Sequence, residues 1–250
     1  TSNTNSGGAS LVLTVPAGTV ANDLLLAQVA VDGGSGTTIT APAGWTLIGR
    51  TDVGSTAHAT YQRTATGSET ATYTWTFSGS LGASGGMVGY AGVEPSSPTT
   101  TTISTSGTGT PFNVTAPTVT VPDSMLVILL AQDSNGTLTA PASMSQLYQS
   151  AYAGPRPGVI ALDEPQPTTG SSGVKSTTAS PGVAFNARSL VLRPLDTTAP
   201  TTPTVSGGSL SWQSVASVTV SASGSTDANT GVTSYQYRTS TDGGSTWGSA

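Results

Sequence analysis

The segment Asp23-Leu24-Leu25-Leu26-Ala27-Gln28 has a counterpart about a hundred residues later, Val121-Pro122-Asp123 followed by Met125-Leu126-Val127-Ile128-Leu129-Leu130-Ala131-Gln132. A second pair of similar segments follows in the same order, TITAPAGW at residues 38–45 and TLTAPASM at residues 137–144. Because two different segments recur in one order, the chain contains two related halves. The longest apolar run, residues 125–131, is too short to cross a bilayer as a helix and suits a strand buried on both faces.

The clearest strand pattern covers residues 71–77. Tyr73, Trp75 and Phe77 share one face of this strand, and threonines occupy the opposite face. We interpret the aromatic face as buried core and the threonine face as solvated. Similar short segments separated by Gly, Pro and Ser turns predict an all-β chain, with a jelly-roll-like β-sandwich built from two related halves plus a partial Ig-like β-sandwich domain. We expect one shared sandwich, because the second half has few aromatic residues.

Turn-rich and proline-rich segments suggest the domain boundaries. Residues 1–9 are predicted to be a flexible segment, and residues 10–195 the sandwich, with halves at 10–98 and 112–195. Residues 196–204 form a Thr/Pro linker that favours an extended backbone. Residues 205–250 offer only three or four strands, including a hairpin signal at Asp242, so an Ig-like domain there is incomplete or is completed by another chain.

The composition is unusually poor in charge. Charged residues make up 8% of the chain, against roughly 25% in an average domain. The net charge of −5, with Lys175 as the one lysine, argues against nucleic acid or an anionic membrane surface as a partner. The short apolar runs predict no membrane insertion. The chain has no cysteine, and residues 1–8 lack the features of a signal peptide. The Thr/Ser/Gly-rich composition favours an extracellular location, on a cell surface or a virion surface.

Several motifs resemble known modules. VPAGT at residues 15–19, APAGWTLI at 41–48, YTWTFS at 73–78 and GYAGV at 89–93 resemble a β-sandwich module of large secreted bacterial surface proteins, which also occurs in phage fibre proteins. This resemblance covers about residues 10–194. DTTAP at residues 196–200, SYQYR at 234–238 and DGGSTW at 242–247 are similar to the start of a bacterial Ig-like or fibronectin-like repeat. The resemblance implies a multidomain surface, adhesive or fibre-forming protein and brings no catalytic residue with it.

Residues that could perform catalysis are few. His58 is the one histidine, and we interpret it as an exposed strand residue rather than part of a triad. Glu69, Glu94, Asp163 and Glu164 are the carboxylates that a glycosidase would have to pair. Glu69 falls in a predicted turn and Glu94 precedes a proline, both ordinary surface positions. We therefore predict no enzyme activity and no catalytic residues.

Binding residues are predicted for two kinds of ligand. Trp45, Trp75 and Tyr90 could stack on sugar rings if they lay exposed in a row. Calcium is the one cofactor considered, with carboxylate ligands near the domain boundary and in loops. Its candidate ligands are Asp196, Asp227 and Asp242.

Two classes of function remain open from the sequence. The first is a non-enzymatic extracellular structural or adhesive protein, either a surface adhesin module or the subunit of a fibre or filament. Its partners would be other copies of itself or neighbouring surface-protein domains. The alternative is a carbohydrate-binding module of a secreted multidomain protein, with glycans as partners. A phage virion fibre or decoration protein is a third possibility.

Overall fold

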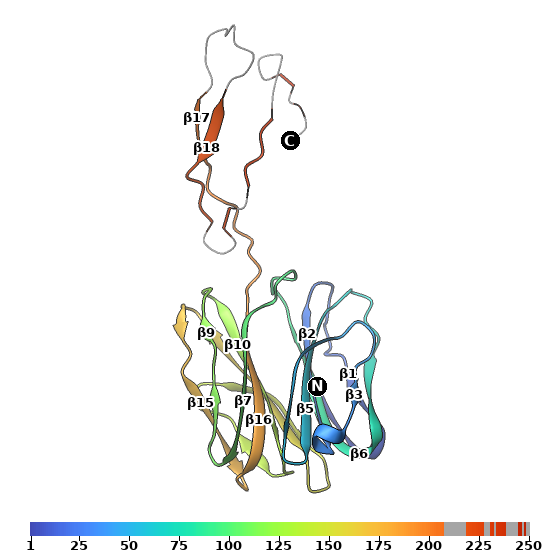
Figure 1. Cartoon of the computed structure of the whole chain (residues 1–250). Coiled ribbons are helices and arrows are strands. Elements are labelled where there is room, and N and C mark those ends of the chain that lie inside the picture. Colours follow the sequence, from blue (N-terminus) through green and yellow to red (C-terminus); the bar gives the residue numbers. More distant parts are fainter. Residues whose placement is uncertain (208–218, 228–230, 233, 239–244, 247, 249–250) are drawn as a thin grey trace. The chain divides into compact units, whose positions relative to one another are not determined.

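The computed structural model describes residues 1–207, 219–227, 231–232, 234–238, 245–246 and 248 (Figure 1). The chain divides into two compact units, residues 1–195 and 196–250. The described residues form β-strands, and their one helical element is the short 3-10 turn η1, Gly34–Gly36. The predicted all-β class is therefore confirmed.

Half one consists of six strands. The central strand is β2, and the order across the main sheet is β1-β6-β2-β5-β4, with β3 added to β6. All pairs are antiparallel. The strands are β1 (Ser2–Thr14), β2 (Leu24–Asp32), β3 (Ile39–Thr40), β4 (Thr46–Val53), β5 (Thr56–Thr64) and β6 (Thr72–Tyr90).

Half two repeats this arrangement. Its large sheet has the order β12-β13-β10-β16-β7, in which β10 takes the place of β2 and β7 the place of β1. The strands of this sheet are β7 (Thr99–Gly109), β10 (Ser124–Gln132), β12 (Ser145–Ala151), β13 (Gly158–Gln166) and β16 (Val183–Leu192). The smaller pieces are β8 (Phe112–Thr115), β9 (Thr118–Val119), β11 (Thr137–Thr139), β14 (Gly170–Ser171) and β15 (Val174–Ser180).

The halves differ in how the second layer of each sandwich is made. In half one β1 and β6 run on past a bend, and their far ends form the layer that faces β2 and β5. In half two the corresponding strands are interrupted, so β8 and β15 form a separate sheet with β11. Cis peptide bonds precede Pro111 and Pro181 at these two interruptions. A 19-residue strand in one half thus corresponds to two shorter strands in the other.

Each half has its own hydrophobic core. Trp75 and Leu25 are fully buried in the core of half one, and Phe112 and Ile128 in that of half two. Aromatic rings fill half one, where the Trp45 and Trp75 centroids lie 5.1 Å apart. The single shared sandwich that we expected is therefore wrong. The core of half two combines one stacked pair of rings, Phe112 and Phe185 with centroids 4.4 Å apart, with aliphatic residues that include Leu126, Leu130, Ile160 and Leu162.

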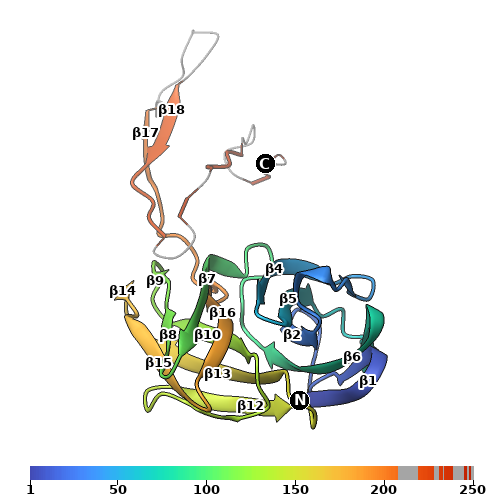
Figure 2. The same ribbon diagram turned by 60° about the horizontal axis from the view of Figure 1, so that its bottom comes forward.

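The two large sheets pack against each other and enclose a third cluster of buried residues (Figure 2). We call this contact the joint. From half one it takes Leu24, Leu26, Ala30, Val88 and Val93, and from half two Val127, Leu129, Ala131, Tyr148, Val159, Ala161, Leu190 and Leu192. Since alternate residues of β2 and β10 face a core and the joint, these strands are buried on both faces. This explains their unbroken apolar sequences.

Strand register shows which residues of the halves correspond. Ala30 pairs with His58, and Ala131 pairs with Val159, at the same place in each sheet. In this structural alignment Gln28 corresponds to Leu129, whereas an alignment of the two repeated sequences would match Gln28 with Gln132. The sequence alignment is wrong at this position, because Gln28 faces the joint and Gln132 lies on the side of β10 that faces the core of half two.

The predicted boundaries need two corrections. Residues 1–9 are not a flexible segment, because β1 begins at Ser2 and pairs along β6. Half two begins earlier than residue 112, because β7 at residues 99–109 is the edge strand of its large sheet. In the second unit, β17 (Thr204–Gly207) pairs with β18 (Val220–Ser223). The predicted hairpin at residues 242–244 lies outside the described residues.

Core packing around Trp75 gives a direct test of this fold. Trp75→Ala should lower the free energy of unfolding by about 3–5 kcal/mol, because it empties a fully buried position. The matched control is Thr74→Ala on the exposed face of the same strand, with an expected change under about 1 kcal/mol. Urea unfolding measures both. Equal losses would contradict the assignment of faces.

Candidate functional site

The joint encloses four polar side chains that touch one another. Gln28 and His58 come from half one, and Tyr148 and Asn186 come from half two. All four are buried, with His58 only 3% exposed. We call these four residues the polar centre. Buried polar groups require partners, so their contacts decide whether the joint is stable.

Gln28 connects the two halves directly. Its Nε2 donates to the Tyr148 hydroxyl at 3.0 Å and to the Ile160 carbonyl at 2.9 Å, both in half two. The Gln28 Oε1 has no proton and can only accept, and His58 Nε2 lies 3.0 Å from it. The Gln28 amide therefore bonds to two strands across the joint, β12 and β13, and to His58 of β5 in its own half.

His58 lies between two amide oxygens. Its Nδ1 meets Asn186 Oδ1, while Asn186 Nδ2 donates to the Thr51 carbonyl at 3.2 Å. A neutral imidazole donates to only one of these two oxygens. The pKa of His58 is lowered to about 4, chiefly by burial and to a smaller extent by the nearby Arg188 charge, against the raising effect of the Asn186 hydrogen bond. At neutral pH the ring is uncharged.

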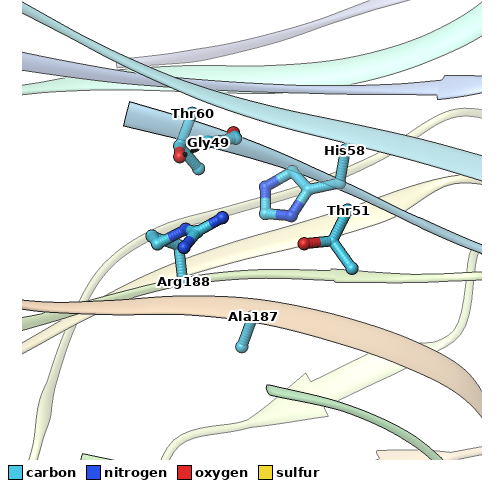
Figure 3. A pocket seen from close by; sticks show the side chains of 6 residues that line it. All are labelled: Gly49, Thr51, His58, Thr60, Ala187 and Arg188. Carbon is cyan, nitrogen blue, oxygen red and sulfur yellow. Dashed lines mark hydrogen bonds between the residues drawn. The ribbon is translucent and has the colours of Figure 1, made fainter. Parts of the chain in front are cut away.

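A narrow crevice reaches the polar centre from one side (Figure 3). Thr51 and Thr60 flank His58, and Arg188 extends from β16 toward Gly49. The crevice leaves no room for a water molecule. The hydrogen bonds of the polar centre join the two halves to each other.

The prediction that His58 is an exposed strand residue is wrong. The sequence alternation correctly separates His58 and Thr60 from Ala59 and Tyr61 on the two faces of β5. It gives no sign that the second face is covered, because the covering sheet comes from a segment about a hundred residues away. The polar centre was missed for the same reason.

The three predicted sugar-binding rings do not form an exposed row. Trp45 and Trp75 are buried in the core of half one. Tyr90 is partly buried, and its hydroxyl donates to Asp163 Oδ2 at 3.3 Å. It lines two hollows of about 130 and 250 Å³. Trp45 and Trp75 are thus structural residues, and Tyr90 lies apart from them.

The carboxylates considered for catalysis are all engaged. Glu69 accepts from Arg63 Nε at 3.0 Å and from Tyr73, and these hydrogen bonds lower its pKa to about 2 against the opposing effect of burial. Glu164 forms an ion pair with Lys175. Glu94 accepts from the backbone and hydroxyl of Ser96.

The calcium candidates receive little support. Among the residues that the structure describes, no three acidic, histidine or cysteine side chains gather into a possible metal site. Asp196 accepts a hydrogen bond from the Thr198 amide at 2.8 Å, as in a local turn. Asp227 is partly buried, and Asp242 lies outside the described residues.

Comparison with known proteins places the chain in no family: no family model, curated protein or solved structure matches it. In the described part of the chain, none of the helices has the length and apolar character needed to span a bilayer.

The buried histidine predicts a pH dependence of stability. The pKa of a histidine in an unfolded chain is about 6.5, and the pKa of His58 in the folded chain is about 4, so the unfolded chain binds a proton first as the pH falls. The free energy of unfolding should therefore drop by about 3 kcal/mol between pH 7 and pH 4. Below that range this contribution no longer changes.

The measurement is urea unfolding at several pH values, with His58→Gln as the control. Glutamine keeps a donor for one of the two amide oxygens and has no titrating group. The wild type should lose more stability than His58→Gln between pH 6.5 and pH 4. Parallel pH profiles would show that His58 does not control this dependence.

Proposed function

We propose that the chain is a non-enzymatic structural or adhesive part of an extracellular protein, a surface adhesin module or a subunit of a fibre on a cell or virion. The observation that carries this proposal is the joint, in which two sandwiches are fixed together across their large sheets. A buried, hydrogen-bonded contact of this kind makes a stiff body suited to bearing load rather than to opening around a substrate.

The internal placement of the polar candidates supports the same proposal. His58 is enclosed in the joint, and Glu69 and Glu164 are held by Arg63 and Lys175. The low charge of the chain, 8%, suits a surface built from threonine, serine and glycine. The resemblance to secreted bacterial modules, and to phage fibre proteins, agrees with this role.

A carbohydrate-binding module is the weaker candidate. A carbohydrate-binding role requires Trp45, Trp75 and Tyr90 to form a row of exposed rings. The two tryptophans are buried instead. A glycan array with the full chain would detect binding elsewhere, and Tyr90→Ala would then show whether the hollows beside that residue take part.

Self-association distinguishes a fibre subunit from an isolated module. Light scattering of the full chain over a range of concentrations, with and without a calcium chelator, should give a mass above the 24.7 kDa of one chain that grows with concentration. Insensitivity to the chelator is expected if calcium has no part in assembly. A constant mass of one chain at every concentration would contradict the fibre-subunit role.

A further inference from the structure

The joint has nearly two-fold symmetry. The edge strand β1 of half one lies beside β12, and β7, which corresponds to β1, lies beside β4 (Figure 2). Side chains link both pairs of edges. Thr51 Oγ1 lies 2.7 Å from Ser104 Oγ, and Ser150 Oγ donates to the Asn3 carbonyl at 3.4 Å. Thr51 and Ser150 occupy corresponding positions, and their partners Ser104 and Asn3 differ by one position in register, so the two contacts are nearly equivalent.

Two large side chains and two glycines break this symmetry. Tyr148 covers Gly86, where an added Cβ would meet the ring at 2.3 Å. Arg188 covers Gly49, where an added Cβ would meet the guanidinium at 2.0 Å. By strand register Gly49 corresponds to Tyr148, and Gly86 corresponds to Arg188. Half one therefore supplies both recesses and half two supplies both side chains that fill them.

This distribution selects unlike halves. Two copies of half one would leave glycine opposite glycine and would enclose two Gln28–His58 pairs without their partners in half two. Two copies of half two would bring Tyr148 against Arg188 at both places. Only half one with half two fills the recesses and satisfies the polar centre.

The covalent link between the halves is short, and its Val93 is buried at the margin of the joint. Residues 92–98 pair with the end of half two, through Glu94 N to the Arg193 carbonyl at 3.0 Å and Leu195 N to the Gly92 carbonyl at 2.7 Å. Only Ala91 lies between the end of β6 at Tyr90 and this pairing, and the next residue, Gly92, has φ 67°. None of the polar or recess contacts described above involves these residues.

We propose that half one of one copy binds half two of a second copy through the same joint, so that copies of the chain are linked by exchanging halves. The partner surface is the joint face of half two, with Tyr148 and Arg188 as the residues that enter the recesses. The biological use of this exchange rests on the proposed role as a fibre subunit. Within one chain the connector holds the halves at high effective concentration, which favours closure on itself.

Blocking closure within the chain tests the exchange. Leu26→Asp damages the joint face of half one, and Leu129→Asp damages that of half two, while both residues point away from their own cores. When the two full-length variants are refolded together, half one of the Leu129→Asp chain should join half two of the Leu26→Asp chain. Light scattering should then shift from one chain of 24.7 kDa to a pair of chains. Each variant refolded alone is the control, and masses that stay at one chain in the mixture would overturn the proposal.

A second experiment avoids variants of the joint. A protease site replaces Ser96 and Ser97 in the full chain, and the cut protein is mixed with an isotope-labelled cut copy. Native mass spectrometry should show mixed complexes that each contain one half one and one half two. Complexes of like halves, or no mixing after denaturation and refolding together, would overturn the proposal. Neither experiment requires the wild-type chain to assemble, so failure of the fibre role gives a different result from failure of the exchange.

Discussion

The constraint on which the structure depends is the burial of the two large sheets on both faces. A sandwich of ordinary design solvates the outer face of each sheet. Here the outer faces of β2 and β10 carry Leu26 and Leu129, which are fully buried in the joint. The two cores and the joint consequently form a stack, and each large sheet contributes apolar side chains to two layers. Removal of either half would leave a leucine- and valine-rich face in water.

The two halves share one fold but present different residues at corresponding positions of the joint. Leu129 and Val159 occupy the places of Gln28 and His58, and they are apolar. The polar centre thus combines the Gln28 amide and the His58 imidazole of half one with Tyr148 and Asn186 of half two. Neither of these two residues occupies the position in half two that corresponds to Gln28 or His58. A buried polar group specifies its partner more strictly than an aliphatic one, because an unmatched donor or acceptor costs free energy. The asymmetry of the centre therefore fixes which faces meet.

The sequence predicts many of the strands, but it does not predict the joint between the two halves. Alternation along residues 71–77 correctly placed Trp75 inside and Thr74 outside, because a period of two is a local property. It failed for His58 and for residues 1–9, whose surroundings come from distant segments. The repeat of LLLAQ was real as a sign of two halves but misled residue by residue, since Gln28 and Gln132 face different layers. Local patterns give faces, and only the fold tells what covers them.

The double burial of β2 has a consequence for biosynthesis. Half one leaves the ribosome first, and its joint face stays uncovered until β16, which ends at Leu192, has been made. At about 5–20 residues per second this delay lasts several seconds. During that time the nascent chain exposes an apolar sheet surface that is prone to aggregation. A chaperone that holds the chain, or slow secretion in the unfolded state, would protect this surface from aggregation. Translation pauses within half two would lengthen the exposure and lower the yield of folded protein.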